Sequence, residues 1–462
     1  MTDAAPRLAA VAETLLGAPL PVRVRAWDGT EAGPPTGPVL VIHDRRAVRR
    51  MLWKPGELGL ARAWVAGELT VEGDLFAMLE QVAGLLWERP AHSGPLPPAG
   101  RPGPLGALGS LARRAKRARP LALPEATRLL REPGHRAAVR ELIALAGPLP
   151  PPAPPAEEAA LKDGQRHSKG RDRQAVGHHY DVGNDFYGHV LGPSMVYSCA
   201  YWSPGATLEQ AQYDKLDLVC RKLALRPGDR LLDVGCGWGS MALHAAREYG
   251  VRVTGITLSR EQAAFGRKRV AEEGLADLVE LRIQDYRDVK DGPYDAISSI
   301  GMAEHVGADR YRDYARTLHA LLRPGGRLLN HQIARPPEPD EEAYRVDEFI
   351  DAYVFPDGEL SPLGSTVGEL ERAGFEVRDV EALREHYGLT LRAWVARLEE
   401  HWAEAVRLTS PGRARVWQLY MAASALGFER GRLGVNQVLA VKSGAAGDAG
   451  LPLRLRTWGA GA

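Results

Sequence analysis

The sequence predicts an α/β fold in which helices cover a mostly parallel sheet. Three observations support this prediction. Apolar, β-rich runs alternate with segments of helical spacing from about residue 230 onward. A glycine-rich turn joins the first of these runs to the first helix. The chain of 462 residues is also longer than one ordinary core requires, and proline-dense stretches before residue 160 separate a smaller N-terminal region.

Seven strand-like segments follow one another in the C-terminal region, and we expect them to form one Rossmann-like sheet. The first five lie at 230–234, 251–256, 278–283, 294–300 and 327–333. Segments of helical spacing separate them at 240–249, 259–273 and 310–322. The last two strands, 375–380 and 433–441, are expected to close the sheet as an antiparallel edge.

Proline and glycine predict the domain boundaries. Residues 91–109 and 147–155 are too rich in proline to hold long regular elements. We therefore expect a smaller α+β module at 1–90, a Pro/Gly-rich basic linker with helical segments at 91–170, and the large domain at 171–462.

Composition excludes several classes of protein. Lys and Arg number 59 against 58 Asp and Glu, so no global positive field favours nucleic acid. Three cysteines cannot form a disulfide framework and show no zinc spacing, so we expect a reduced, cytoplasmic protein without a metal. No apolar run approaches the ~20 residues that span a bilayer. Any membrane association is therefore expected to be peripheral.

The turn after the first strand carries alternating glycines behind an acidic residue: Asp233, Gly235, Gly237 and Gly239. Glycines let the backbone turn sharply and approach a ligand closely. A dinucleotide fingerprint would need glycine at Ser240 and an acid at the end of the second strand, where Thr257 stands. The loop therefore disfavours a pyrophosphate cofactor and favours S-adenosylmethionine (SAM), with a purely structural turn as the minority alternative.

Six sequence blocks, taken in order, resemble one family. They are HYDVGNDFY at 179–187, YSCAYW at 197–202, the glycine loop at 231–239, GITLS at 255–259, QDYRD at 284–288 and GMAEHVG at 301–307. Over about residues 174–442 the chain resembles the cyclopropane-fatty-acyl-phospholipid synthases and the mycolic acid cyclopropane synthases. The resemblance implies a class I SAM-dependent methyltransferase domain behind an N-terminal lipid-binding module, which residues 57–74 resemble.

The resemblance also implies a reaction. An alkene inside an unsaturated phospholipid acyl chain attacks the methyl group of SAM and leaves a carbocation on the neighbouring carbon. Loss of a proton from the new methyl group then closes a cyclopropane ring. In this family the base is understood to be a bound bicarbonate ion. Proximity supplies roughly 7–11 kcal/mol of such a barrier, and a dry apolar tunnel suits the cation.

By match to the family motifs, five residues form the bicarbonate pocket: Cys199, Glu304, His331, Ile333 through its backbone, and Tyr387. We hypothesise that Glu304 and His331 share a proton, so that the imidazole donates to the anion. Each residue also has an ordinary alternative. Cys199, His331 and Tyr387 would then be core residues, and Glu304 an exposed helix start.

The same match assigns SAM binding to ten residues: Tyr197, Ser198, Asp233, Gly235, Gly237, Gly239, Thr257, Gln262, Asp285 and Tyr286. Gln262 is expected to bond the ribose, because Thr257 stands where most Rossmann-type methyltransferases have an acid. Asp285 and Tyr286 are expected to meet the edge and face of the adenine. The alternative for Gln262 is an ordinary surface position on a helix.

Two basic segments are candidates for contact with anionic headgroups. One comprises Arg113, Arg114, Lys116, Arg117 and Arg119, for which headgroup binding and a merely solvated linker are equally favoured. The other comprises Met51, Leu52 and Trp53 with Arg49, Arg50 and Lys54 beside them. Trp and cations prefer a membrane interface, but core packing of Trp53 is the favoured alternative there.

Several functions stay open at this point. A cyclopropane product is favoured over a methylene branch, which a separate reductase partner would convert to a methyl branch. The alternatives of another class are a non-catalytic lipid-binding scaffold subunit and a small-molecule C- or O-methyltransferase. The expected partners are the phospholipid surface at the inner face of the membrane, unsaturated acyl chains and a second copy of the chain. Nucleic acid is not expected.

Overall fold

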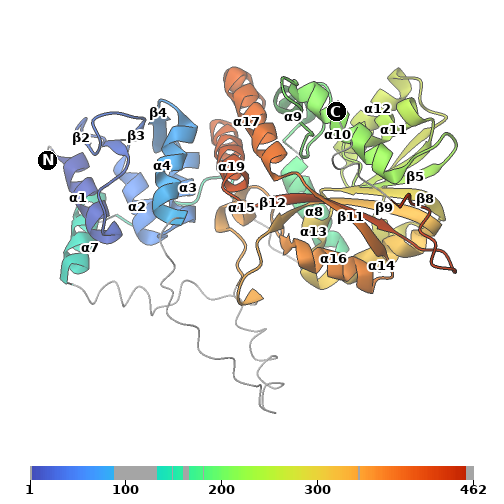
Figure 1. Ribbon diagram of the computed structural model, residues 1–462. Coiled ribbons are helices and arrows are strands. Elements are labelled where there is room, and N and C mark those ends of the chain that lie inside the picture. The colour runs from blue at the N-terminus through green and yellow to red at the C-terminus, as the bar shows by residue number, and fades with distance from the viewer. Residues whose placement is uncertain are drawn as a thin grey trace, which may run out of the picture. The chain divides into compact units, whose positions relative to one another are not determined.

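The computed structural model describes residues 3–87, 133–147, 149–159, 166–180, 182–341 and 344–453. The chain divides into two compact units, Met1–Pro154 and Pro155–Ala462 (Figure 1). No helix in the described ranges combines the length and the apolar character that crossing a bilayer requires. The first basic segment, at 113–119, lies outside the described residues.

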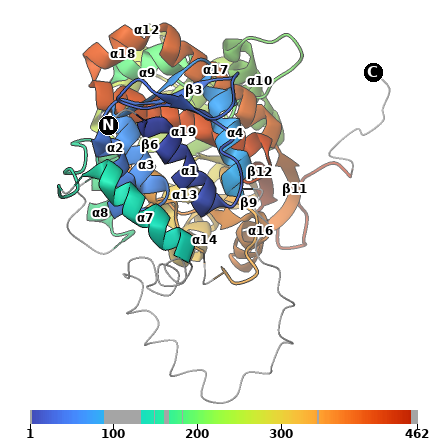
Figure 2. The same ribbon diagram turned by 90° about the vertical axis from the view of Figure 1, so that its left-hand side faces the viewer.

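The first unit is built on a small mixed sheet in the order β2-β1-β3-β4. Its strands are β1 (Arg23–Arg25), β2 (Glu31–Ala32), β3 (Val39–Ile42) and β4 (Leu69–Glu72). Its helices are α1 (Ala4–Leu16), α2 (Arg45–Trp53), α3 (Glu57–Val65), α4 (Leu75–Trp87) and α7 (Pro133–Ala146). Helix α7 runs alongside α1 (Figure 2), where Leu145 packs on Ala4 and Ala5. The predicted linker at 91–170 therefore contains a helix that belongs to the first unit, because small side chains on α1 let the two helices pack closely.

Helix α2 divides its basic residues between the interior and the surface. Arg50 is buried, donates from Nε to Glu68 Oε2 over 2.9 Å, and bonds the carbonyl of Ala153 at 2.8 Å. Trp53 is 62% exposed, so the favoured prediction that it packs in the core was wrong. Trp53 is the last residue of the helix, whereas the buried residues Ala47, Val48 and Arg50 lie nearer to its N-terminus.

The second unit contains the predicted seven-stranded, mostly parallel sheet, in the order β11-β12-β9-β8-β5-β6-β7. The strands are β5 (Arg230–Val234), β6 (Arg252–Thr257), β7 (Val279–Ile283), β8 (Tyr294–Ile300), β9 (Leu322–Arg335), β11 (Glu376–Ala382) and β12 (Gly434–Val441), and a short β10 (Ser361–Pro362) pairs with β9. β12 is antiparallel to both of its neighbours. β9 begins at Leu322, earlier than expected, because Leu322 already pairs with Tyr294 of β8 before the register shifts.

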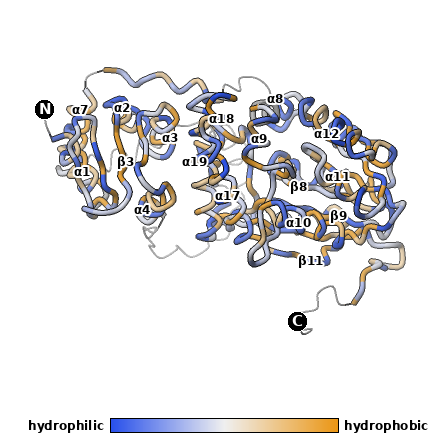
Figure 3. Tube along the Cα trace, turned by 90° about the horizontal axis from the view of Figure 1, so that it is seen from above, coloured by the Kyte–Doolittle hydropathy of each residue, from blue (hydrophilic) through white to orange (hydrophobic). Residues whose placement is uncertain are grey.

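Helices cover both faces of this sheet. They are α8 (Lys169–Tyr180), α9 (Asn184–Leu191), α10 (Leu208–Leu223), α11 (Ser240–Tyr249), α12 (Arg260–Glu272), α13 (Ala303–Val306), α14 (Tyr311–Leu321), α15 (Glu348–Tyr353), α16 (Leu363–Arg372), α17 (Arg384–Glu400), α18 (Trp402–Leu408) and α19 (Pro411–Glu429). Neighbouring residues of a strand point to opposite faces, so Leu231 joins the core under α10 and α11, and Leu232 joins the core against α14. Figure 3 shows hydrophobic and hydrophilic residues interleaved along these helices, as helices with one buried face require.

One row of cross-strand neighbours runs from the sheet edge toward its centre. Glu381 of β11 lies opposite Gln437 of β12, and Gln437 lies opposite His331 of β9. His331 in turn pairs with Ile300, the last residue of β8. Residues that face each other across strands project to the same side of a sheet, so this row brings groups far apart in sequence into one line.

Candidate active site

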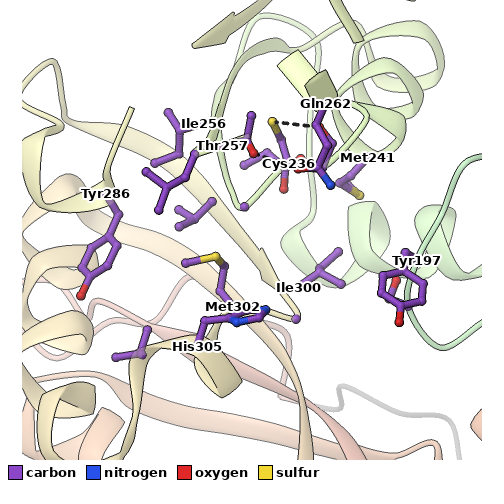
Figure 4. Close-up of a pocket in the computed structure, with 18 of the residues that line it drawn as sticks. Tyr197, Cys236, Met241, Ile256, Thr257, Gln262, Tyr286, Ile300, Met302 and His305 are labelled. Carbon is purple, nitrogen blue, oxygen red and sulfur yellow. Dashed lines mark hydrogen bonds between the residues drawn. The ribbon is translucent and has the colours of Figure 1, made fainter. Parts of the chain in front are cut away.

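A pocket opens beyond the carboxyl ends of β5, β6 and β8, where the strand order reverses between β5 and β8. Ligands of open α/β sheets bind at such a switch point. All predicted cofactor residues except Gly239 line it. In Figure 4, Tyr286 lies on one side of the pocket and Tyr197 on the other, with Met302 between them and with Thr257 and Gln262 above.

The glycines of the loop have distinct tasks. Gly235 (φ 76°) and Gly237 (φ 54°) line the pocket in backbone conformations that other residues rarely adopt. A Cβ at Gly235 would lie 2.5 Å from Met302 Cγ. Gly239 (φ 83°) is instead the residue before α11, and a Cβ there would meet Leu281 at 3.1 Å. Gly239 turns the chain into the helix and does not line the pocket, so its place beside the cofactor stays a prediction.

Thr257 and Gln262 form a preorganised pair at the end of β6. The hydroxyl of Thr257 donates to Gln262 Oε1 over 3.0 Å, and Ser259 caps α12 by accepting from the amide of Gln262 at 3.2 Å. Gln262 is 3% exposed and lines the pocket, so it is no surface position. With its oxygen occupied, the side-chain NH₂ of Gln262 is the group that can donate to a ligand's hydroxyls.

Asp285 and Tyr286 follow the end of β7 and line another side of the pocket. Arg287 donates to both oxygens of Asp285, at 2.7 and 2.6 Å, and also to Asp172 at 2.8 Å. Burial raises the pKa of Asp285, but the hydrogen bonds and charge of Arg287 outweigh it and leave that pKa lowered. Tyr286 stacks edge-on against Tyr314 with centroids 4.9 Å apart. The wall thus combines an ionised acceptor with an aromatic face.

Asp233 and Lys215, a residue that the sequence analysis missed, both line the pocket. Asp233 is 2% exposed; its Oδ1 accepts from Ser298 at 2.7 Å, and its Oδ2 has no partner within the described part of the chain. Burial raises its pKa to about 6. Lys215 of α10 is buried, lines the pocket and donates to the Ser198 hydroxyl over 2.9 Å. Burial lowers the pKa of Lys215 to about 8.

A signal for Lys215 was present in the sequence. The buried stripe of α10 includes Leu208, Ala211, Leu216, Val219 and Leu223, and its helical period also takes in Lys215 and Gln212. A charged residue within an apolar stripe marks either a strained core or a polar site beneath it. Gln212 likewise turns inward and donates to the carbonyl of Ser198 at 2.9 Å.

The five predicted catalytic residues do not line this pocket; they lie in the packed layer next to it. Hydrogen bonds and one strand pairing connect four of them, Cys199, Tyr387, Ile333 and Glu304. Cys199 Sγ lies 3.6 Å from the carbonyl oxygen of Leu383, and the amide of Tyr387 bonds the same oxygen at 3.2 Å. Leu383 bonds the carbonyl of Val435, which pairs with Ile333 across β12 and β9. The Ile333 amide then donates to Glu304 over 2.8 Å.

Glu304 and His331 each carry one buried atom without a hydrogen bond. Glu304 Oε1 accepts from Ile333, whereas Oε2 has no partner among the described residues. His331 Nδ1 lies 3.2 Å from Gln437 Nε2, whereas its Nε2 is likewise without a partner there. Among the described residues Glu304 bonds the Ile333 amide and His331 bonds Gln437, and no hydrogen bond joins the two side chains directly, so the shared proton stays a prediction. The Ile333 amide, expected at the anion, is occupied by Glu304.

Burial is the largest cause of the shifted pKa values of Glu304, His331 and Cys199. It raises the pKa of Glu304 to about 7, against the opposing effect of the Ile333 hydrogen bond. It lowers the pKa of His331 to about 3, and the charges of Lys215 and Lys222 act in the same direction. Burial also raises the pKa of the Cys199 thiol. At neutral pH the layer therefore holds a neutral imidazole, a thiol and a carboxyl near its titration point.

Aromatic rings pack against the rings of Tyr197 and Tyr387. Tyr197 lies 5.3 Å from Trp394, which lies 6.1 Å from Tyr387, between ring centroids. The Tyr387 ring lies tilted against Phe428 at 4.6 Å, and the hydroxyl of Tyr197 donates to that of Tyr420 over 3.2 Å. Such a wall is apolar and excludes water from whatever lies against it.

A switch-point pocket with alternating glycines, an amide in place of a ribose-binding acid and no pyrophosphate fingerprint defines a class I SAM-dependent methyltransferase. The comparisons narrow this class. The family model described as mycolic acid cyclopropane synthetase matches residues 167–438. The chain belongs to that family, and it is a SAM-dependent methyltransferase of the cyclopropane synthase type.

Proteins of similar sequence support this family assignment. A probable fatty acid methyltransferase of Mycobacterium tuberculosis is 43% identical over 441 residues, which cover 94% of each chain. The cyclopropane-fatty-acyl-phospholipid synthase of Escherichia coli is 38% identical over 261 residues, 56% of this chain and 66% of that one.

Solved structures agree as well. The cyclopropane synthase MmaA2 from Mycobacterium tuberculosis is similar with a TM-score of 0.55 and 33% identity, over 59% of this chain and 98% of that chain. The mycolic acid cyclopropane synthase CmaA1, solved with SAH and CTAB, gives a TM-score of 0.55 at 33% identity over 58% and 97%. SAM is therefore the cofactor of this enzyme.

Proposed function

We propose that this enzyme transfers the methyl group of SAM to the double bond of an unsaturated phospholipid acyl chain and that the product is a cyclopropane. The observation that carries the proposal is the pair of unpartnered buried atoms, Glu304 Oε2 and His331 Nε2, in the layer beside the pocket. Buried polar atoms normally find partners, so each of these atoms is a candidate contact for a small ion that has both a donor and acceptors. Bicarbonate has one O–H group for Glu304 and oxygens for His331.

The chain's own residues prepare the transfer. SAM supplies an electrophilic methyl group when it is bound. Gly235 and Gly237 let the backbone approach it, Gln262 donates toward its hydroxyls, and Asp285 with Tyr286 meets its ring. The aromatic wall of Tyr197, Trp394 and their neighbours excludes water that would trap a cation.

Cys199, Glu304, His331 and Tyr387 are proposed to hold the bicarbonate, which supplies a base for the departing proton. Neutral His331 suits this task because it can donate a hydrogen bond without adding a full charge beside the cation. Glu304, with its pKa raised to about 7 by burial, accepts from the ion's O–H group when ionised. Ile333 is proposed to act through Glu304, whose carboxylate it fixes, rather than to bind the ion itself.

A specific observation favours a second product. The Mycobacterium tuberculosis relative that aligns over 94% of this chain, N-terminal unit included, is named a probable fatty acid methyltransferase. A methylene branch would arise from the same cation by loss of a different proton, and a reductase partner would then be required. That partner and the second copy of the chain remain predictions.

Lipids from a host that expresses only this enzyme test the proposal. We expect mass spectrometry to show acyl chains heavier by one CH₂ and proton NMR to show high-field cyclopropyl signals. Vinylidene protons instead would establish the methylene product. Unchanged lipids together with calorimetric binding of SAM would point to a small-molecule methyltransferase, and unchanged lipids without SAM binding would revive the scaffold alternative.

A further inference from the structure

We propose that Lys222 and Gln437 form a hydrogen-bond relay that fixes His331 in the tautomer with its proton on Nε2. The relay makes Lys222 and Gln437 positioning residues for the buried site. The inference about the tautomer concerns this chain alone, and its link to the bound anion rests on the proposed function.

Sheet register supplies the framework of the relay. Glu381, Gln437 and His331 are direct neighbours across β11, β12 and β9, so their side chains project to one face. Lys222, near the C-terminal end of α10, reaches this row and bonds both Glu381 Oε2 and Gln437 Oε1. The side chains of Lys222 and Glu381 are 12% and 20% exposed, whereas Gln437 and His331 are buried.

Donor and acceptor chemistry then determines the orientation of the amide. A lysine ammonium has three donors and no acceptor, so the atom of Gln437 that lies 2.7 Å from Lys222 Nζ must be the oxygen. An amide oxygen and nitrogen are otherwise hard to tell apart, and a neighbour that can only donate resolves the choice. The NH₂ of Gln437 therefore faces His331 Nδ1 at 3.2 Å.

The orientation of the amide determines the tautomer of the ring. Because the NH₂ group donates, Nδ1 of His331 must accept with its lone pair, and a neutral imidazole then carries its proton on Nε2. Nε2 is the buried atom without a partner. Burial and the charges of Lys215 and Lys222 lower the pKa of His331, which keeps the ring neutral.

The consequence is that His331 Nε2 is fixed as a hydrogen-bond donor toward the proposed anion site. With the relay intact, His331 presents an N–H donor to an anion; with the amide reversed, it would present a lone pair and repel one. A charged pair at the partly exposed end of the row thus sets the hydrogen-bonding character of a buried group. The two links, Lys222 to Gln437 and Gln437 to His331, span 215 and 106 residues of sequence.

Long-range proton–nitrogen NMR on perdeuterated enzyme with ¹⁵N-labelled histidine tests the relay without turnover. The variant His331→Asn identifies the signal of His331. We expect the unmodified enzyme to show a protonated Nε2 and a pyridine-type Nδ1. A protonated Nδ1 in the unmodified enzyme would overturn the proposal.

A pair of variants tests the role of Lys222. In Lys222→Met the amide is free to turn, so we expect a protonated Nδ1 signal to appear and turnover to fall roughly 2- to 10-fold, as the fraction of competent enzyme falls. Lys222→Arg keeps a hydrogen-bond donor at this position, so we expect its His331 tautomer and its turnover to match those of the unmodified enzyme. Lys268→Met, at an exposed ion pair on α12, is the matched control. An unchanged Nε2 proton in Lys222→Met would exclude the relay.

Two further measurements separate this inference from the proposed function. SAM affinity by calorimetry should not change in Lys222→Met, because neither Lys222 nor Gln437 lines the SAM pocket. Addition of bicarbonate should shift the Nε2 signal of the unmodified enzyme. If the tautomer is as proposed but bicarbonate leaves the signal unmoved, the relay stands and the assignment of bicarbonate fails.

Discussion

Glu304 combines a cost in folding stability with the catalytic role that we propose for it. Its carboxyl is buried, one oxygen is held by the Ile333 amide and the other has no partner in the described part of the chain. Burial raises its pKa to about 7. Between the unfolded pKa, about 4.3, and 7, the folded state therefore binds more protons than the unfolded state. Stability falls as pH rises through this window, and the loss is complete above it.

Glu304→Gln should therefore raise stability and abolish most activity at once. The amide keeps an oxygen for Ile333 but cannot ionise, so at pH 8 we expect the free energy of unfolding to rise by about 1–3 kcal/mol. Below pH 4 the difference should vanish. Turnover should fall roughly 10²-fold or more, with SAM affinity nearly unchanged, because Glu304 does not line the SAM pocket. Denaturant titrations at several pH values, with calorimetry and turnover, measure all three.

Glu371→Gln is the matched control, because Glu371 is exposed on α16. It should change neither stability at pH 8 nor turnover. If Glu304→Gln turned over at the normal rate, Glu304 would not belong to the anion site. If its stability gain persisted below pH 4, ionisation of Glu304 would not be the cause.

At the scale of elements, the loop between β5 and α11 shows why one glycine differs from another. Gly235 and the exposed Gly205 share a positive φ, 76° and 78°. A Cβ at Gly205 would meet nothing within 4 Å, whereas a Cβ at Gly235 would lie 2.5 Å from Met302 Cγ. Both positions carry the same backbone cost, and only Gly235 adds a clash inside the pocket.

We expect Gly205→Ala and Gly235→Ala each to lose roughly 1–2 kcal/mol of stability from the left-handed backbone. Gly235→Ala should in addition weaken SAM binding at least tenfold, because Met302 must move within the cofactor pocket. Thermal unfolding and calorimetry separate the two effects. Equal SAM affinity in both variants would mean that the loop does not approach the cofactor.

The sequence predicted the elements whose signal is local. The seven strands, the glycine loop and the helices around it all follow from periodicity and from turn chemistry over a few residues. The early start of β9 did not, because it depends on the pairing of Leu322 with Tyr294. Helix α7 was assigned to a linker because the partner that buries Leu145 lies on α1, far away in sequence.

The residues of the candidate site likewise divide into those that local sequence predicts and those that depend on distant partners. All of the cofactor residues except Gln262 lie within the resembling blocks, and all except Gly239 line one pocket. Gln437 and Lys222 could not be assigned from single positions, because their partners lie on other strands and helices. The proton that we expected Glu304 and His331 to share depended on which strand neighbour claims each side chain, and only the register decides this.

At the scale of the whole molecule, the proposed phospholipid substrate raises the question of how an enzyme without a spanning helix in its described residues would reach an acyl chain within a bilayer. The first unit offers one surface for this purpose. Trp53 is 62% exposed at the end of α2, and Arg45 and Arg46 on the same helix are also exposed. Arg50 is excluded from this surface by its buried ion pair with Glu68. An exposed Trp at one end of the helix and exposed arginines at the other suit the interface of an anionic membrane.

Trp53→Ala should therefore weaken binding to vesicles that contain anionic phospholipid. Withdrawing an indole from the interface costs about 1–2 kcal/mol, which corresponds to roughly 5- to 30-fold weaker partitioning. Activity on vesicles should fall in parallel, whereas activity on the same lipid dispersed in detergent should not, because Trp53 is remote in sequence from the SAM pocket and does not line it.

Ile143→Ala, at a 50% exposed apolar position on α7 of the same unit, is the matched control and should leave sedimentation with vesicles unchanged. Higher salt should weaken the binding of both variants and of the unmodified enzyme, because the arginines act through screened charge. Equal binding of Trp53→Ala and the unmodified enzyme at every salt concentration would exclude this end of α2 as the membrane contact.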